Sequence, residues 1–237
     1  MKKYLAILTS ISCLIFCSLI IDSKTPPSNK TEFEKLSNCI NNKSLKTPLH
    51  QPIADIKKNS IATISYKTKA KTSLTYCKNN SLNTSFCLLQ DLSKHSGKFR
   101  IYVWDFNKNM ATDSGLVSHG CDDLPWSGTD SKDSAVCSNV DGSHCSASGK
   151  YKIGSRGYSQ WGIKINYLLH GLEASNKNAL KRTIVLHSWD AVGDVEIYPE
   201  GTPEGWGCPA VSDAFLTRVD VLLKNTQKPV LLWVFNN

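Results

Sequence analysis

The sequence predicts a mainly β domain with a single flanking α-helix. From Lys98 onward, short apolar runs of strand length recur between turn-forming residues. Only one late segment, residues 212–225, carries apolar residues at helical spacing. Many strands with one late helix are typical of a mainly β fold. We therefore place the main domain over residues 96–237, preceded by an N-terminal region of poorly defined structure.

Residues 1–22 have the pattern of a signal peptide or an N-terminal anchor. Lys2 and Lys3 precede an almost uncharged run that ends near Ile21. Cys17 follows Phe16, which is too large for a typical lipoprotein processing site. No later run of about 18 apolar residues follows, so a second membrane span is not expected. The leader predicts an exported protein of the periplasm or cell envelope.

Residues 23–95 form a basic extension. They hold 12 Lys and 4 acidic residues, whereas residues 96–237 hold 14 Lys plus Arg and 15 acidic residues. Residues 23–50 have the composition of a linker. A solvated polar segment is one interpretation of this charge, and attraction to an anionic cell envelope is the other. Nucleic acid is not an expected partner, because the exported chain has no motif that combines basic and aromatic residues.

Two short elements are expected inside this extension. Residues 61–66 alternate well enough for a strand. Residues 84–93, with Phe86 and three leucines, favour a short helix that closes near Gly97.

The main domain begins with an expected hairpin. Residues 99–105 alternate as a strand, a turn follows at 107–109, and residues 111–118 form the returning arm. A long loop is expected over 121–145. Further strands are expected at residues 149–153, 162–169, 183–188 and 229–235.

The single clear helix is expected to begin after Ser212, whose hydroxyl is a good N-cap. Helical spacing predicts that Phe215, Val219, Val221 and Leu222 face the core.

Nine cysteines suggest an oxidising compartment. Setting aside two in the leader and Cys208 leaves an even number, which is typical of disulfides, and six cysteines allow 15 pairings. Closeness in sequence favours Cys77 with Cys87, and Cys137 with Cys145. A zinc site around residues 119–145 is the rival interpretation, but the spacings do not fit a zinc knuckle. We expect no metal and no other cofactor.

The residues that flank Cys208 and His187 mark these two as a candidate nucleophile and a candidate base. Cys208 lies in Gly-Trp-Gly-Cys-Pro, a turn that can present the thiol and aim the backbone amides of Trp206, Gly207 and Cys208 at one point, as an oxyanion hole does. His187 ends an apolar strand 21 residues earlier, and the Ser188 carbonyl can orient its ring. A cysteine beside an imidazole can ionise and attack acyl groups, which predicts a thiol acyl-transfer site.

Other side chains are candidates for substrate binding. Arg182 could meet a carboxylate, or it could be a partner of Glu173. His119 and His170 each precede a glycine at a strand end, where they could face the cleft or simply pack. Trp206 and Trp189 could form walls of the pocket, or they could belong to the core.

Five motifs from Val117 to Val211 resemble a known family. They are Val117-Ser-His-Gly120, the stretch from Cys137 to Tyr151, His170-Gly-Leu-Glu173 with Asn178-Ala179, Arg182 to His187, and Gly205-Trp-Gly-Cys-Pro-Ala-Val211. Together they resemble the murein L,D-transpeptidase catalytic domain family, a divergent YkuD-like branch. The common family pattern has a histidine where this chain has Trp206.

The resemblance implies a β-sandwich or barrel with a flanking helix. It also implies Cys208 as nucleophile, His187 as base, the Ser188 carbonyl as orienting group, and the amides around Gly207 as oxyanion hole. The implied substrates are peptidoglycan stem peptides, and the implied reaction forms 3–3 cross-links through a cysteine acyl-enzyme on tetrapeptide stems. An L,D-carboxypeptidase or other peptidoglycan hydrolase on the same site, and a wall-binding module without activity, remain the alternatives.

Overall fold

A computed structural model describes residues 53–236, with side chains from residue 65 onward. The expected leader and most of the linker, including the first three cysteines, lie outside these residues. The described elements, in chain order, are α2 (Ile53–Asn79), β1 (Phe86–Asp91), β2 (Ile101–Asp105), β3 (Met110–Gly115), β4 (Gly149–Tyr158), β5 (Ile165–Gly171), the 3₁₀ turn η1 (Ala174–Asn176), β6 (Val185–Ser188), β7 (Ala210–Val211), α3 (Asp213–Lys224) and β8 (Leu231–Phe235).

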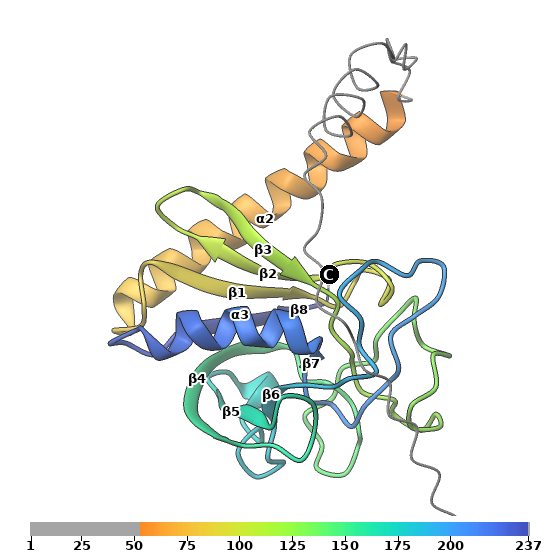
Figure 1. The fold of residues 1–237 in the computed structure, drawn as a ribbon. Helices are drawn as coiled ribbons and strands as arrows, with labels where there is room; N and C mark the ends of the chain where they lie inside the picture. Colours follow the sequence, from red (N-terminus) through yellow and green to blue (C-terminus); the bar gives the residue numbers. More distant parts are fainter. Residues whose placement is uncertain (1–52, 237) are drawn as a thin grey trace, which may run out of the picture. The chain divides into compact units, whose positions relative to one another are not determined.

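All eight strands belong to one curved sheet in the order β3-β2-β1-β8-β4-β5-β6-β7. The pairs β1–β8 and β6–β7 are parallel, and the others are antiparallel. Beyond β3, Val117 forms an antiparallel bridge with Val211 of β7, so the two edges of the sheet meet and nearly close a barrel. The prediction of a mainly β, barrel-like fold with a flanking helix is confirmed (Figure 1).

The helix expected over residues 84–93 is wrong, because this segment forms β1 in the middle of the sheet. Leu88 faces the main core, whereas Cys87 and Leu89 face the cluster under α2. A strand buried on both faces loses the alternation that identifies strands, and short apolar runs then resemble helices. The main sheet therefore includes residues before 96.

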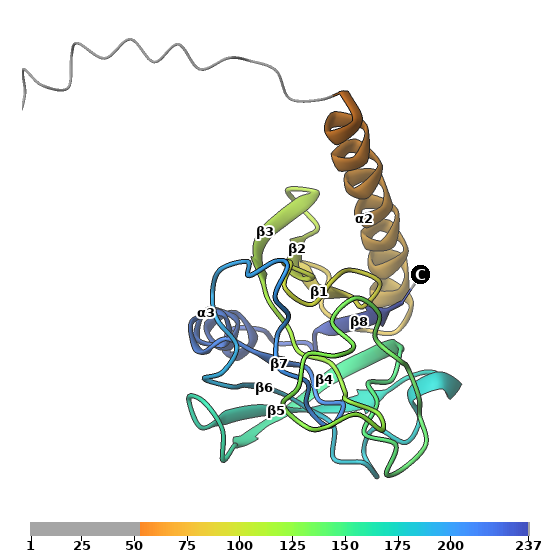
Figure 2. The ribbon, with the colours of Figure 1, turned by 90° about the vertical axis from the view of Figure 1, so that its right-hand side faces the viewer.

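The strand expected over residues 61–66 is also wrong, since these residues belong to α2. The side of α2 that meets the sheet carries Ala70, Ser73 and Cys77, all buried and spaced as one helical face. Small and partly polar residues give a weak apolar signal, although they allow a close approach to the sheet. Figures 1 and 2 show α2 and α3 on opposite sides of β1. Among the described residues, no helix has the length and apolar character needed to cross a membrane.

Helix α3 begins as expected, because the Ser212 hydroxyl accepts the amide of Phe215 at 3.1 Å. Phe215 and Val219 are buried, but Val221 and Leu222 are exposed, contrary to expectation. Leu216, Asp220 and Leu223 take their places on the inner face. Asp220 is accommodated there because it accepts hydrogen bonds from the Tyr167 hydroxyl and the Arg156 guanidinium.

The cysteine pairings are not formed, since all six cysteines of the described residues are free thiols. The sulfur of Cys137 accepts from the Asn236 side chain, whereas that of Cys145 contacts Asp122. These two thiols thus have separate partners, although they are close in sequence. Cys77 and Cys87 are buried in the cluster beneath α2.

We predict that Phe215→Ala lowers the free energy of unfolding by about 3–5 kcal/mol, because it leaves a cavity between α3 and the sheet. Val221→Ala on the same helix is the control, since its side chain is 52% exposed and the expected change is within about 0.5 kcal/mol. Chemical denaturation of both variants measures the difference. Equal losses in the two variants would contradict the placement of α3.

Candidate active site

The pairing of β6 with β7 brings the predicted nucleophile and base together. The strands are parallel, with His187 opposite Ala210, and the His187 amide donates to the Pro209 carbonyl at 3.3 Å. Side chains alternate along a strand, so Cys208, two residues before Ala210, is directed toward the same face as His187. Both side chains line one cavity of about 410 Å³.

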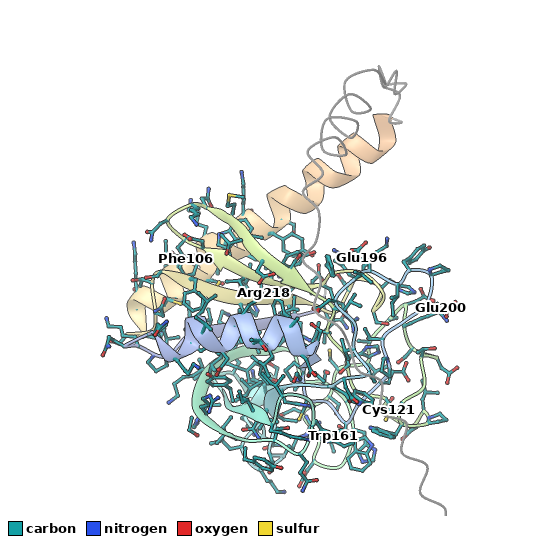
Figure 3. All side chains as sticks on the ribbon, in the orientation of Figure 1. Phe106, Cys121, Trp161, Glu196, Glu200 and Arg218 are labelled. Carbon is teal, nitrogen blue, oxygen red and sulfur yellow. The ribbon has the colours of Figure 1, made fainter. Side chains whose placement is uncertain are left out.

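The cavity wall is mostly aromatic. Besides His187, Cys208 and Ala210, the lining consists of Ser118, Gly205 and four tryptophans, Trp126, Trp161, Trp189 and Trp206. Trp161 lies among the loops beside β6 and not in the sheet (Figure 3). The lining contains no Asp, Glu, Lys or Arg, so a thiol in this cavity is in an apolar environment.

The Cys208 thiol is neutral at rest. Its sulfur accepts the Val185 amide at 3.4 Å and lies 3.9 Å from the Thr183 carbonyl. Burial raises the pKa of Cys208, and the Val185 amide and the positive charge of Arg182 offset only part of that rise. Among the described residues, the thiol's hydrogen-bond partners do not include His187, so the structure shows the two groups without a direct hydrogen bond.

The His187 ring is held in one tautomer. Its Nδ1 lies 2.9 Å from the Ser188 carbonyl, which can only accept, so the proton is on Nδ1 and Nε2 keeps its lone pair. Burial lowers the pKa of His187, and the Ser188 carbonyl offsets part of that effect. The imidazole is therefore a neutral base whose free nitrogen is Nε2.

Ser188 is fixed by the loop before β5. Its hydroxyl accepts the Ile163 amide at 3.0 Å. Gly162 adopts φ +51°, and a Cβ there would lie 2.0 Å from the Ser188 hydroxyl oxygen. A larger residue does not fit at this position, so the close approach keeps the Ser188 carbonyl, and with it the His187 ring, in place.

The turn before Cys208 leaves three amides unused. Gly207 adopts φ +96°, a conformation that favours glycine, and its carbonyl accepts the Ser146 hydroxyl at 3.3 Å. Within residues 53–236, the amides of Trp206, Gly207 and Cys208 have no hydrogen-bond acceptor. Three free donors in succession beside a thiol are suited to bind a developing oxyanion.

His119 lies beneath the cavity and does not line it. The ring is fully buried, with Nδ1 accepting from Arg100 at 2.8 Å and Nε2 at 2.9 Å from the Ser131 hydroxyl. Ser131 in turn donates through its amide and its hydroxyl to Glu204. Burial, and next the charge of Arg100, lower the pKa of His119 to about 3. This chain of hydrogen bonds joins the 117–131 segment to Glu204, immediately before the nucleophile turn.

Arg182 and His170 have other neighbours. The Arg182 guanidinium donates to the carbonyls of Ser138 and Cys145, at 3.0 and 2.6 Å, whereas Glu173 pairs with Lys150. His170 packs against Gly154 at a separate surface hollow on β4 and β5. The substrate-binding roles of Arg182, His170 and His119 stay predictions. Arg182 acts on the site at least through its charge near Cys208.

The loop from 190 to 204 contacts residues 98 and 99, which do not line the cavity. The Phe99 amide donates to Glu196, and Lys98 forms an ion pair with the same carboxylate at 3.1 Å. Figure 3 shows Glu196 and Glu200 on this loop, apart from Trp161.

Sequence reasoning missed Trp126, Trp161, Ser118 and Glu204. Trp126 follows Pro125 and precedes Ser-Gly, and Trp161 stands between Gln160 and Gly162. A tryptophan isolated in a polar turn has no strand pattern to bury it, and that is the signal that could have placed both residues at a site.

Comparison with known proteins identifies one matching family. A family model of the L,D-transpeptidase catalytic domain matches residues 57–233. Among solved structures, the chain is similar to the helical cell shape determining protein Pgp2 from Campylobacter jejuni, at 12% identity and a TM-score of 0.41, over 65% of this chain and 48% of that one. A point mutant of the same protein gives 12% identity and a TM-score of 0.42, over 65% and 47%. The chain thus spans about half the length of these structures. No curated protein matches it.

We predict that alkylation of Cys208 by iodoacetamide accelerates with pH and is still rising above about pH 9, because burial raises the thiol pKa. Mass spectrometry of the Cys208 peptide over a pH series measures the rate, with Cys208→Ala as the blank. A rate that levels off below about pH 7 would reveal a preformed thiolate and contradict the neutral resting pair.

We further predict that His119 makes the fold sensitive to acid. Its pKa is lower in the folded chain than in the unfolded one, so the unfolded chain takes up the proton first. Stability is then full above about pH 6.5 and falls as the pH approaches about 3. His119→Gln can accept from Arg100 and donate to Ser131 without titrating. The free energy of unfolding of this variant should depend less on pH in that window, and identical pH slopes would refute the assignment.

Proposed function

The chain belongs to the L,D-transpeptidase catalytic domain family, and on that premise we propose that it is a cysteine-dependent acyltransferase that forms 3–3 cross-links between peptidoglycan stem peptides. The observation that carries the proposal is the shared cavity of Cys208 and His187, with Nε2 of His187 free and three unused amides beside the thiol.

The first half-reaction forms the acyl-enzyme. The thiol turns from the Val185 amide toward the substrate, and its sulfur attacks the carbonyl of the diamino acid at position three of a tetrapeptide stem. Nε2 of His187 takes the thiol proton as the sulfur attacks, which leaves an imidazolium beside the intermediate. The tetrahedral oxyanion is bound by the amides of the 206–208 turn.

Collapse of this intermediate breaks the bond to the terminal D-alanine. The imidazolium of His187 returns its proton to the departing amine, leaving a thioester on Cys208 and a neutral ring. The Ser188 carbonyl stabilises the charged ring in the intermediate and keeps Nε2 aimed at the reacting atoms.

The second half-reaction regenerates the enzyme. A side-chain amine of another stem attacks the thioester, Nε2 takes its proton, and the thiol leaves with that proton, giving one new amide bond. The aromatic lining supports an amine as acceptor, since an apolar cavity filled by substrate disfavours water. Attack by water would release a tripeptide and make the protein an L,D-carboxypeptidase.

The proposed substrate implies where the protein acts in the cell. Peptidoglycan lies in the cell envelope, so the protein acts after export, in the periplasm or at the envelope. The basic extension supports contact with an anionic surface there. In its described part, α2 carries six lysines and one aspartate.

We predict that incubation with a disaccharide-tetrapeptide gives a dimer lighter by one alanine, measured by mass spectrometry. Cys208→Ala should remove all product, because Cys208 is the one thiol among the described residues that line the cavity. Cys121→Ala, which removes a buried thiol that does not line the cavity, should retain turnover. Tripeptide without dimer would replace the transpeptidase with the carboxypeptidase, and unchanged substrate with no acyl group on Cys208 would leave a wall-binding module.

A further inference from the structure

Four tryptophans from separate parts of the chain meet at the cavity. Trp126 stacks on Trp189, with ring centroids 5.4 Å apart and planes 17° apart. Trp161 lies 6.1 Å from Trp126 and 6.0 Å from Trp189, and Trp206 lies 6.4 Å from Trp126. The aromatic wall defined by these four rings therefore runs from the nucleophile turn to the loop before β5.

Most of this wall is open to solvent. Trp126, Trp161 and Trp206 are 46%, 45% and 62% exposed, whereas Trp189 is nearly buried beneath them. Single exposed aromatic residues are common on protein surfaces, but three gathered around one cavity are a typical mark of a ligand site. The wall is therefore built to be covered by a ligand with flat apolar faces.

Among the described residues, the cavity lining also includes a hydroxyl without a partner, in addition to the amides of the 206–208 turn and Nε2 of His187. The Ser118 hydroxyl is fully buried, lines the cavity, and among the described residues has no hydrogen-bond partner. A buried hydroxyl without a partner is unfavourable, so a ligand that supplies one is favoured. The ligand thus combines apolar faces with neutral polar groups on its edge.

Along the wall beyond Cys208, the lining offers no charged side chain, so a neutral ligand is favoured there over the charged groups of a stem peptide. Carboxylates and ammonium groups placed there would lose their hydration without gaining a counter-charge. A pyranose ring fits, because its faces carry C–H groups that pack on indole rings and its edge carries hydroxyl and N-acetyl groups.

The dimensions agree with a sugar attached to the donor stem. The stem residue under attack by Cys208 is the third from the glycan strand, and three extended residues reach about 10 Å. The ring of Trp206, two residues before Cys208, lies 6.4 Å from that of Trp126. The ring of Trp126 lies 6.1 Å from that of Trp161. The step from Trp206 to Trp126, 6.4 Å, is shorter than an extended stem of three residues, so a ring on Trp126 is compatible with a stem that starts at the nucleophile turn.

We propose that the aromatic wall is a saccharide subsite that binds an N-acetylhexosamine ring of the glycan strand. This inference rests on the proposed function for the identity of the polymer, and it makes the glycan-linked stem the preferred donor over the free peptide.

The first test is direct binding of chitotetraose, an uncharged oligomer of N-acetylglucosamine, to the parent protein. Indole N–H signals in an NMR titration report on each tryptophan separately. We expect shifts at Trp126 and Trp161 and none at Trp104 and Trp233, which lie near α2 outside the cavity and act as internal controls. Shifts at all six indoles, or none with saturating sugar, would overturn the subsite.

Variants then separate stacking from folding. Trp161→Ala should weaken chitotetraose binding about tenfold, the effect of losing one aromatic contact, and Trp161→Phe should restore most of it. Tyr158→Ala, an exposed aromatic residue outside the cavity, should bind as the parent does. Equal weakening in Trp161→Ala and Tyr158→Ala would contradict the proposal.

Turnover distinguishes this inference from the proposed function. The parent should use a disaccharide-tetrapeptide with a higher kcat/KM than the free tetrapeptide, and Trp161→Ala should reduce that preference. Equal kcat/KM values for the two donors would overturn the subsite while leaving the acyltransferase intact. Sugar binding without any acyl transfer would support the subsite and refute the proposed reaction.

Discussion

The parallel pairing of β6 with β7 is the interaction on which the site depends. It places His187 opposite Ala210 and thereby directs Cys208 toward the same face of the sheet. A shift of one residue in this register would turn one of the two side chains to the opposite face, so the register must be held tightly. Two hydrogen bonds hold it, since the amides of His187 and Trp189 donate to the carbonyls of Pro209 and Val211.

A second constraint lies directly beneath that pairing. Arg100, His119, Ser131 and Glu204 form a hydrogen-bonded chain whose members are mostly withdrawn from water. Polar groups in such surroundings are favourable only when nearly all of them are paired. The hydrogen-bonded chain ends on Glu204, directly before the nucleophile turn, although none of these side chains lines the cavity. His119, in the Val-Ser-His-Gly segment, thus has a structural role as the link between Arg100 and Ser131.

The sequence identified the cysteine and histidine that share the cavity more readily than it identified the elements around them. His187, Ser188 and the Gly-Trp-Gly-Cys turn are local in sequence, so their frames could be recognised directly. β1 could not be recognised, because its apolar run is buried on both faces, and α2 could not, because its inner face is small and partly polar. The ionisation state of Cys208 also required the structure. A cysteine near an imidazole suggests a thiolate, but burial outweighs the Val185 amide and Arg182 and keeps the thiol protonated. The aromatic wall depends on contacts between distant loops, which no local pattern specifies.

The position of β8 in the middle of the sheet affects the order in which the sheet folds. This strand follows all the others in the chain, yet it lies between β1 and β4 and is the link between the β3-β2-β1 group and the β4-to-β7 group. Until β8 is available, each group has an open edge where the other should be attached. Assembly of the sheet must therefore wait for a late segment, through contacts that are distant in sequence and slow to form. During that delay the unpaired edges of β1 and β4 are places where another chain can add a strand.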